Sequence, residues 1–223
     1  MTSIVISSGH GQYIRGASGY LDEVDEARKV VETIADYLRD GGVEVKTFHD
    51  NTSHDQSTNL NTIVNYHNAQ TRDLDISVHF NAYQTTSSPM GTEVLWCSQE
   101  QLAGDVSEAI ANAGDLVNRG PKYRSDLFFL NNTEEPAILI ETCFVDSSAD
   151  ASMYRDNYDA ICAAIANVIA PNTGQPPDRP ERPPVDRPKP PPSSGTAHVD
   201  ITIATTGDVV VTVNGKPIAA ATS

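Results

Sequence analysis

Two histidines and a glutamate stand at or near the ends of short apolar runs in this chain. They are His10 after residues 4–8, His79 within residues 74–80, and Glu141 after residues 137–140; a fourth segment, residues 22–26, supplies further carboxylates. Two histidines and a carboxylate are a recurrent ligand set for catalytic zinc, which keeps one coordination position open for water. A further glutamate can then carry the proton. No other set of residues in this sequence indicates a specific chemistry so clearly.

The acidic ligand has two candidates, Glu23 and Glu26, three residues apart. They would share one face if a helix already began at residue 23. Either one could bind a metal while the other accepts a hydrogen bond from a ligand or favours the helix start. Glu141 follows an apolar strand, where a carboxylate is costly unless it is paired or functional. Such surroundings would raise its pKa towards the range useful for proton transfer.

The elements that position these residues follow from hydrophobic periodicity. Runs typical of strands cover residues 3–7, 43–48, 74–80, 91–97, 128–130 and 137–141, and helical spacing covers 25–40, 60–69, 102–117 and 158–169. Strands that alternate with helices predict an α/β fold with a twisted, mostly parallel sheet and helices on both faces. Sites in such sheets form at the carboxyl ends of the strands, where His10, His79 and Glu141 are expected to lie.

Proline marks the domain organisation, because ten of the 14 prolines fall between residues 171 and 192. Such a stretch cannot build a core and is expected to be an extended spacer. We therefore predict a catalytic domain over 1–170, a Pro-rich linker over 171–195 and a small β-rich segment over 196–223. That segment is too short for an independent core. We therefore expect it to dock on another surface, either of the same chain or, through self-association, of a second copy.

The formal net charge of −15 arises entirely before residue 171. An acidic domain argues against nucleic acid as a partner and against adsorption to an anionic membrane. The sequence has neither an 18-residue apolar run nor a signal-peptide pattern at Met1. We expect a protein that is made in the cytoplasm and needs another route if it acts outside the cell.

Six segments together resemble a known enzyme family. They are Ser-Gly-His-Gly (8–11), Gly-Ala-Ser-Gly-Tyr-Leu-Asp-Glu-Val-Asp-Glu-Ala (16–27), Asn-Leu-Asn-Thr-Ile-Val-Asn-Tyr-His-Asn (59–68), Ser-Val-His-Phe-Asn-Ala (77–82), Phe-Leu-Asn (129–131) and Ile-Glu-Thr-Cys-Phe-Val-Asp (140–146). From about residue 3 to 170, the chain resembles the zinc-dependent N-acetylmuramoyl-L-alanine amidases of the third amidase family, particularly phage endolysins and bacterial autolysins. The resemblance does not extend to the spacer or the tail.

The resemblance implies a sheet of about six strands with helices on both faces. It also implies one zinc ion held by His10, Glu23 and His79, with Glu26 as the fallback ligand and Glu141 as the catalytic acid and base. The implied substrate is peptidoglycan, cut at the amide between the lactyl group of N-acetylmuramic acid and the first L-alanine of the stem peptide.

Further expectations concern the substrate and the tail. Asn81, Arg124 and Asn131 are candidate contacts to glycan or peptide, although ordinary polar loop residues are an equal interpretation. In endolysins the C-terminal part usually recognises the wall, so wall binding is expected of residues 196–223, and action on the wall would follow release from the cell. Two alternatives remain open: a zinc hydrolase of soluble muropeptides or another amide, and a wall-binding module without activity.

Overall fold

The computed structural model describes residues 3–171, 199–203, 209–213 and 216–221. The chain divides into two compact units, Met1–Pro177 and Asp178–Ser223, which are described separately. The predicted linker over 171–195 lies, apart from residue 171, outside the described residues.

The first unit is built on a six-stranded sheet with the order β2-β1-β3-β6-β4-β5. Its strands are β1 (Ser3–Ser8), β2 (Glu44–Phe48), β3 (Leu74–Asn81), β4 (Thr92–Trp96), β5 (Asn118–Tyr123) and β6 (Ala137–Phe144). The pairing of β4 with β6 is antiparallel, and the other pairings are parallel. The predicted α/β fold with a mostly parallel sheet is therefore confirmed.

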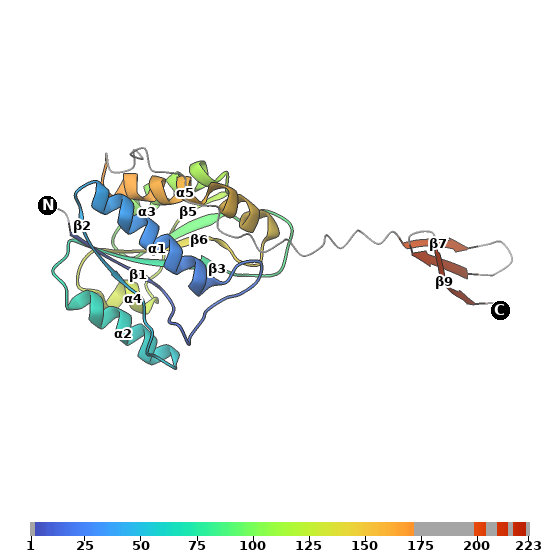
Figure 1. The fold of residues 1–223 in the computed structure, drawn as a ribbon, viewed down its shortest axis with the longest axis horizontal. Helices are drawn as coiled ribbons and strands as arrows, with labels where there is room; N and C mark the ends of the chain where they lie inside the picture. The colour runs from blue at the N-terminus through green and yellow to red at the C-terminus, as the bar shows by residue number, and fades with distance from the viewer. Residues whose placement is uncertain (1–2, 172–198, 204–208, 214–215, 222–223) are drawn as a thin grey trace. The chain divides into compact units, whose positions relative to one another are not determined.

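Helices cover both faces of this sheet. They are α1 (Glu23–Asp40), α2 (Gln56–Asn68), α3 (Glu100–Gly114), α4 (Phe128–Asn132) and α5 (Ser148–Ile169). Figure 1 shows α1, α3 and α5 on one face and α2 with α4 on the other. The larger hydrophobic core lies under α1, α3 and α5, and a smaller one lies under α2 and α4. Both faces of the central strands are buried, which explains their nearly continuous apolar sequences.

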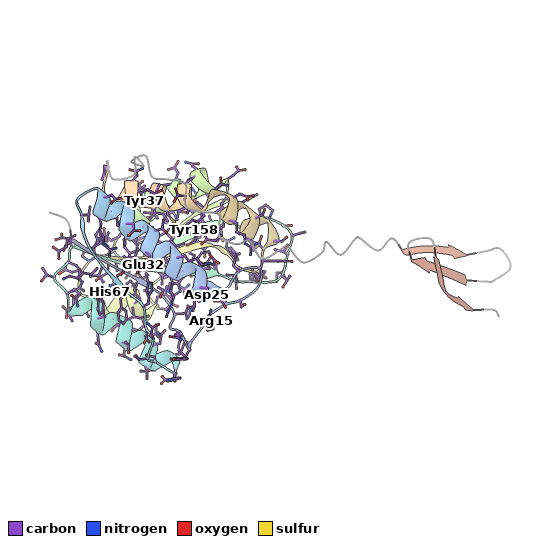
Figure 2. The ribbon with its side chains drawn as sticks, in the orientation of Figure 1. Arg15, Asp25, Glu32, Tyr37, His67 and Tyr158 are labelled. Carbon is purple, nitrogen blue, oxygen red and sulfur yellow. The ribbon has the colours of Figure 1, made fainter. Side chains whose placement is uncertain are left out.

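Helix α1 starts at the residue that matters most for the site. Asp22 caps the helix by accepting a hydrogen bond from the Asp25 backbone amide at 3.2 Å. Arg15 forms ion pairs of 2.6 Å with both Asp22 and Asp25, and it lies beside Asp25 in Figure 2. The cap satisfies an amide that the helix itself cannot bond. Glu23 therefore occupies the first turn, two residues before the predicted start of the helix at Asp25.

Three elements differ from the sequence expectation. Residues 128–130, predicted as a strand, form the single-turn helix α4, because so short an apolar run carries no usable periodicity. Strand β5 was not predicted, since its sequence Asn-Arg-Gly-Pro-Lys-Tyr is polar; it lies at the sheet edge, where proline is tolerated. Helix α5 begins ten residues earlier than predicted, at Ser148, and has non-helical backbone angles at Asn157.

The second unit contains a three-stranded antiparallel sheet in the order β7-β8-β9. Its strands are β7 (Val199–Ile203), β8 (Val209–Val213) and β9 (Lys216–Ala221). The expected roles of this segment in wall binding or self-association stay predictions. Among the described residues, no helix has the length and apolar character needed to cross a membrane.

Asp150 provides a test of how the first unit is held together. Its buried carboxylate accepts hydrogen bonds from the backbone amides of Met90, Gly91 and Phe144 at 2.8, 2.8 and 3.2 Å. Asp150→Asn replaces one acceptor oxygen with a donor, so we expect the free energy of unfolding in urea to fall by about 2 kcal/mol or more. Asp156→Asn, at an exposed position of the same helix, is the control. Equal stability of the two variants would contradict this role.

Candidate functional site

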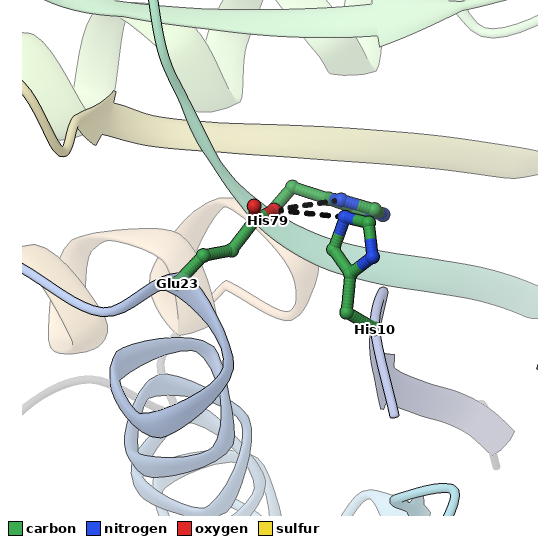
Figure 3. Close-up of side chains that lie close together, drawn as sticks. All are labelled: His10, Glu23 and His79. Atoms are coloured by element: carbon green, nitrogen blue, oxygen red, sulfur yellow. Dashed lines mark hydrogen bonds and ion pairs between the residues drawn. The ribbon is translucent and has the colours of Figure 1, made fainter. Parts of the chain in front are cut away.

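His10, Glu23 and His79 come together from three elements. His10 follows β1, Glu23 lies in the first turn of α1, and His79 lies near the end of β3. Figure 3 shows the Glu23 carboxylate facing both rings, which lie side by side: Oε1 lies 3.3 Å from His10 Nε2 and 3.1 Å from His79 Nδ1. One potential ligand atom from each residue lies within 4.8 Å of the others. This spacing suits a single metal ion shared by three ligands. His10, Glu23 and His79 are called the triad below.

The structure also distinguishes between the two candidate glutamates. Glu26 Oε1 accepts a hydrogen bond from Lys29 at 2.8 Å, and its Oε2 accepts one from the Tyr154 hydroxyl at 3.0 Å. Glu26 is thus engaged beside α5, whereas Glu23 faces both histidines.

The backbone holds the Glu23 carboxylate in place. The Ala17 amide donates to Oε2 at 2.7 Å, and the Phe80 amide donates to Oε1 at 3.2 Å. Gly16 has a φ of +67°, and a Cβ there would lie 2.3 Å from Glu23 Oε2. Only glycine combines this backbone conformation with so close an approach. The loop before α1 therefore positions the carboxylate.

Contacts at Nε2, on the side of the ring away from Glu23, orient the His79 imidazole. Its Nε2 lies 3.0 Å from the Ser77 hydroxyl, and a Cβ on Gly9 would lie 1.7 Å from the same nitrogen. When Nδ1 binds a metal ion, its lone pair faces Glu23 and His10, and Nε2–H can donate to the Ser77 hydroxyl, as outer hydrogen bonds to metal-binding histidines generally do. Sequence reasoning did not assign Ser77 a role. Its position two residues before His79, on the same face of β3, was the available signal.

The protonation states in the triad follow from its burial. Burial alone would raise the pKa of Glu23, but hydrogen bonds with His10 and His79 outweigh it and hold that pKa well below its usual value. Burial lowers the pKa of His79, and the hydrogen bond that its ring donates to the Glu23 carboxylate opposes the effect. The arrangement therefore favours an ionised carboxylate beside a neutral imidazole, which are the forms that bind a divalent cation.

Glu141 lies beside the triad on the next strand. It is the register partner of His79 in the β3–β6 pairing and of Glu93 in the β6–β4 pairing. Burial, with smaller contributions from Glu23 and Glu93, raises the pKa of Glu141 to about 8, while Arg124 opposes the shift. Its Oε2 is buried and has no hydrogen-bond partner among the described residues. Such an atom is available to a group that enters the site.

A cavity of about 390 Å³ opens in front of these side chains and is lined by His10, His79, Glu141 and Arg124. Arg124 forms two hydrogen bonds of 2.8 Å to the carboxylate of Asp126. The remaining wall is mostly apolar and includes Leu60, Leu95, Phe128 and Leu139. Polar groups that converge on a largely apolar hollow are typical of a ligand site.

The other two predicted substrate contacts lie elsewhere. The Asn81 amide donates to Glu93 Oε1 at 2.9 Å, and Asn81 lines a neighbouring cavity. Asn131 is exposed on α4 and donates to the Leu127 carbonyl at 2.7 Å; it lines neither cavity. A role in substrate binding stays a prediction for Asn81, Arg124 and Asn131.

Two further histidines stand between a serine and a carboxylate, in the order of a catalytic triad. They are His67, which lies 2.9 Å from Ser7 and 2.7 Å from Asp75, and His49, which lies 3.0 Å from Ser8 and 3.1 Å from Glu32. Both serines are completely buried, so no substrate reaches them. Figure 2 shows His67 on α2 and Glu32 on α1, on opposite faces of the sheet. These groups join helices to the sheet and are structural.

The sequence matches the N-acetylmuramoyl-L-alanine amidase family over residues 4–171. The chain belongs to this family. Among curated relatives, it is 34% identical over 158 residues to an uncharacterized 38.4 kDa protein of Clostridium perfringens, covering 69% of this chain and 46% of that one. It is 28% identical over 160 residues to the probable cell wall amidase LytH of Staphylococcus epidermidis, covering 69% and 52%. The chain therefore spans about half the length of these curated relatives.

Solved structures of amidases share the fold of the first unit. The catalytic domain of the CD27L endolysin targeting Clostridia difficile has a TM-score of 0.70 at 23% identity, covering 76% of this chain and 97% of that domain. The N-acetylmuramoyl-L-alanine amidase AmiC2 of Nostoc punctiforme has a TM-score of 0.64 at 25% identity, covering 75% and 94%. The amidase fold thus accounts for the whole six-stranded unit, and neither match implies anything for the tail.

The pKa of Glu141 predicts a pH-dependent cost to stability in the metal-free protein. A carboxyl group whose pKa is raised by folding lowers the free energy of unfolding as the pH rises. The loss occurs between the pKa of the unfolded state, near 4.5, and the pKa of the folded state, near 8. Glu141→Gln should therefore match the native chain near pH 4 and be more stable by up to about 5 kcal/mol above pH 8, as measured by urea unfolding in chelator. Glu134→Gln, at an exposed position, is the control. A difference that does not change between pH 4 and 9 would refute the shift.

Proposed function

We propose that this chain is a zinc-dependent N-acetylmuramoyl-L-alanine amidase that hydrolyses the amide between N-acetylmuramic acid and the first L-alanine of the peptidoglycan stem. The observation that carries the proposal is the juxtaposition of His10, Glu23 and His79 with Glu141, the register partner of His79. Membership of the amidase family supports the choice of bond.

The three residues of the triad fit zinc. Two imidazole nitrogens and one carboxylate oxygen are the donors of many catalytic zinc sites. The side chains of His10, Glu23 and His79 are only 17%, 5% and 15% exposed, so the ligands are held in a sheltered site rather than on an open surface. When bound there, zinc would polarise a carbonyl oxygen and lower the pKa of a water molecule.

The protein's own side chains supply the proton transfer and the orientation. Glu141 accepts a proton from the attacking water and returns it to the nitrogen of the leaving amine. Its pKa of about 8 suits a group that must both accept and release a proton near neutral pH. The mostly apolar wall of the cavity excludes water from the other side of the substrate, and Arg124 offers positive charge at its rim.

The wider setting of the activity is also part of the proposal. The relative LytH is described as a probable cell wall amidase, which supports the wall as the site of action here. We further infer that residues 196–223 bind the wall or a second copy of the chain, and that the protein reaches the wall after leaving the cytoplasm. The acidic first unit supports neither nucleic acid nor an anionic membrane as a partner.

The bond is tested by identifying new chain ends after the full chain has been incubated with purified peptidoglycan, with and without a chelator. We expect free L-alanine amino termini, no new reducing sugars, loss of the reaction on chelation and recovery with added zinc. Cleavage of free muropeptides with intact walls left turbid would instead favour the muropeptide hydrolase. Wall binding without new termini would favour a module that has lost activity.

The roles within the site are tested by two substitutions. Glu141→Ala should retain zinc but lower turnover by about a hundredfold or more, because only the proton carrier is lost. His79→Ala should lose zinc as well, which metal analysis of the purified protein measures directly. His54→Ala, at an exposed histidine that stacks on Tyr13, is the matched control. Full activity of Glu141→Ala would exclude this mechanism.

A further inference from the structure

A row of charged and polar side chains crosses four adjacent strands at one edge of the sheet. His79 on β3 is the register partner of Glu141 on β6, and Glu141 is the register partner of Glu93 on β4. Arg119 on β5 continues the row, because its Nε donates to Glu93 Oε2 at 2.7 Å. Register partners point to the same face of a sheet, so the row leads from the proposed zinc site to a single arginine.

The reversed direction of β4 and β5 makes this row possible. Glu93 and Arg119 each lie second in their strands, whereas Glu141 lies in the second half of β6. Because β4 runs antiparallel to β6, the starts of β4 and β5 lie at the same edge as the ends of β3 and β6. Both residues therefore stand beside the site, although neither follows a strand.

Arg119 is held in a way that leaves much of its guanidinium available. Its Nε is bonded to Glu93, and its central carbon lies 5.0 Å from the centre of the Phe144 ring. Its two terminal nitrogens have no hydrogen-bond partner among the described residues, and 37% of the side chain is exposed. Arg124, by contrast, already uses two nitrogens on Asp126. Arg119 is thus fixed on one side and open for a carboxylate on the other.

Arg119 lines a second cavity, of about 330 Å³, together with Asn81, Ala82, Tyr83, Met90 and Phe144. Arginine is the only cation in this lining, and Tyr83 is 76% exposed at its rim. The unit that contains it carries the whole net charge of −15. An acidic peptide would be repelled by such a unit unless a local cation offset the repulsion, and Arg119 is placed to do so.

The distance along the row identifies which part of a substrate would reach this cavity. Neighbouring strands lie about 4.8 Å apart, so β5 lies roughly 10 Å from β6 and Glu141. An extended peptide advances about 3.3–3.6 Å per residue, so roughly 10 Å corresponds to about three residues, and to fewer because the Arg119 side chain reaches back towards β4 to bond Glu93. We propose that Arg119 and the cavity around it form a subsite for a carboxylate on the second or third residue of the peptide that leaves the scissile amide. This subsite rests on the proposed amidase function and adds a substrate preference to it.

The subsite is tested by binding and by cleavage. The binding probe is the tripeptide L-alanyl-γ-D-glutamyl-L-lysine, with its two free carboxylates or with both converted to amides, titrated calorimetrically into the full chain. We expect the carboxylate form to bind about tenfold tighter or more, the size of a charge-assisted hydrogen-bonded pair. Arg119→Met should abolish this difference, and Arg119→Lys should retain part of it. Lys46→Met removes one positive charge at the opposite edge of the sheet and should leave the difference intact.

The same two peptides joined to N-acetylmuramic acid separate this inference from the proposed function. Native protein should cleave both and prefer the carboxylate form in kcat/KM, with the preference in KM, and Arg119→Met should cleave both equally. Equal binding of the two tripeptides by native protein, or a preference that survives in Arg119→Met, would overturn the subsite. Failure of native protein to cleave either conjugate would reject the amidase function, while the calorimetric comparison would still decide the subsite.

Discussion

The site depends on one interaction, the contact of the Glu23 carboxylate with the rings of both His10 and His79. A buried carboxylate is unfavourable unless its charge is compensated, and here two ring nitrogens and two backbone amides provide that compensation. The first turn of α1 must therefore meet the ends of β1 and β3 within a narrow range of positions. Gly16 lets the loop approach the Glu23 carboxylate closely, and the Asp22 cap sets the start of the helix.

The same constraint links the fold to the chemistry. The triad places an ionised carboxylate at the ends of β1 and β3, whereas the Glu141 carboxyl group is buried one strand away. Two carboxylates in one site thus have opposite pKa shifts: the pKa of Glu23 is lowered by hydrogen bonds from the histidines, and that of Glu141 is raised by burial. An ionised carboxylate beside two histidines, with a second carboxyl group nearby that can exchange its proton, is the combination that the proposed metal-assisted hydrolysis requires.

Much of the scaffold was predictable because its signals are local. Burial on both faces of a strand requires a continuous apolar run, which marks β1, β3 and β6 in the sequence. Burial of one stripe of a helix requires apolar residues at helical spacing, which marks α1. The misassigned elements lack such a signal. Strand β5 is polar and lies at the edge, so nothing apolar marks it, and Phe128–Leu130 is too short to show whether its period is that of a strand or a helix.

The sequence by itself determined which residue types were available for chemistry and roughly where they stood: His10, His79 and Glu141 at the ends of apolar runs, and an acidic residue near the start of a helix. The family resemblance favoured Glu23 over Glu26 as the acidic residue of the site. The contacts came from the tertiary structure, because only packing shows Glu26 bonded to Tyr154 and Glu23 facing both histidines. The reversal of β4 was likewise invisible in the sequence. A strand's direction depends on which neighbour it pairs with, and that pairing brought Glu93 and Arg119 to the edge where His79 and Glu141 lie.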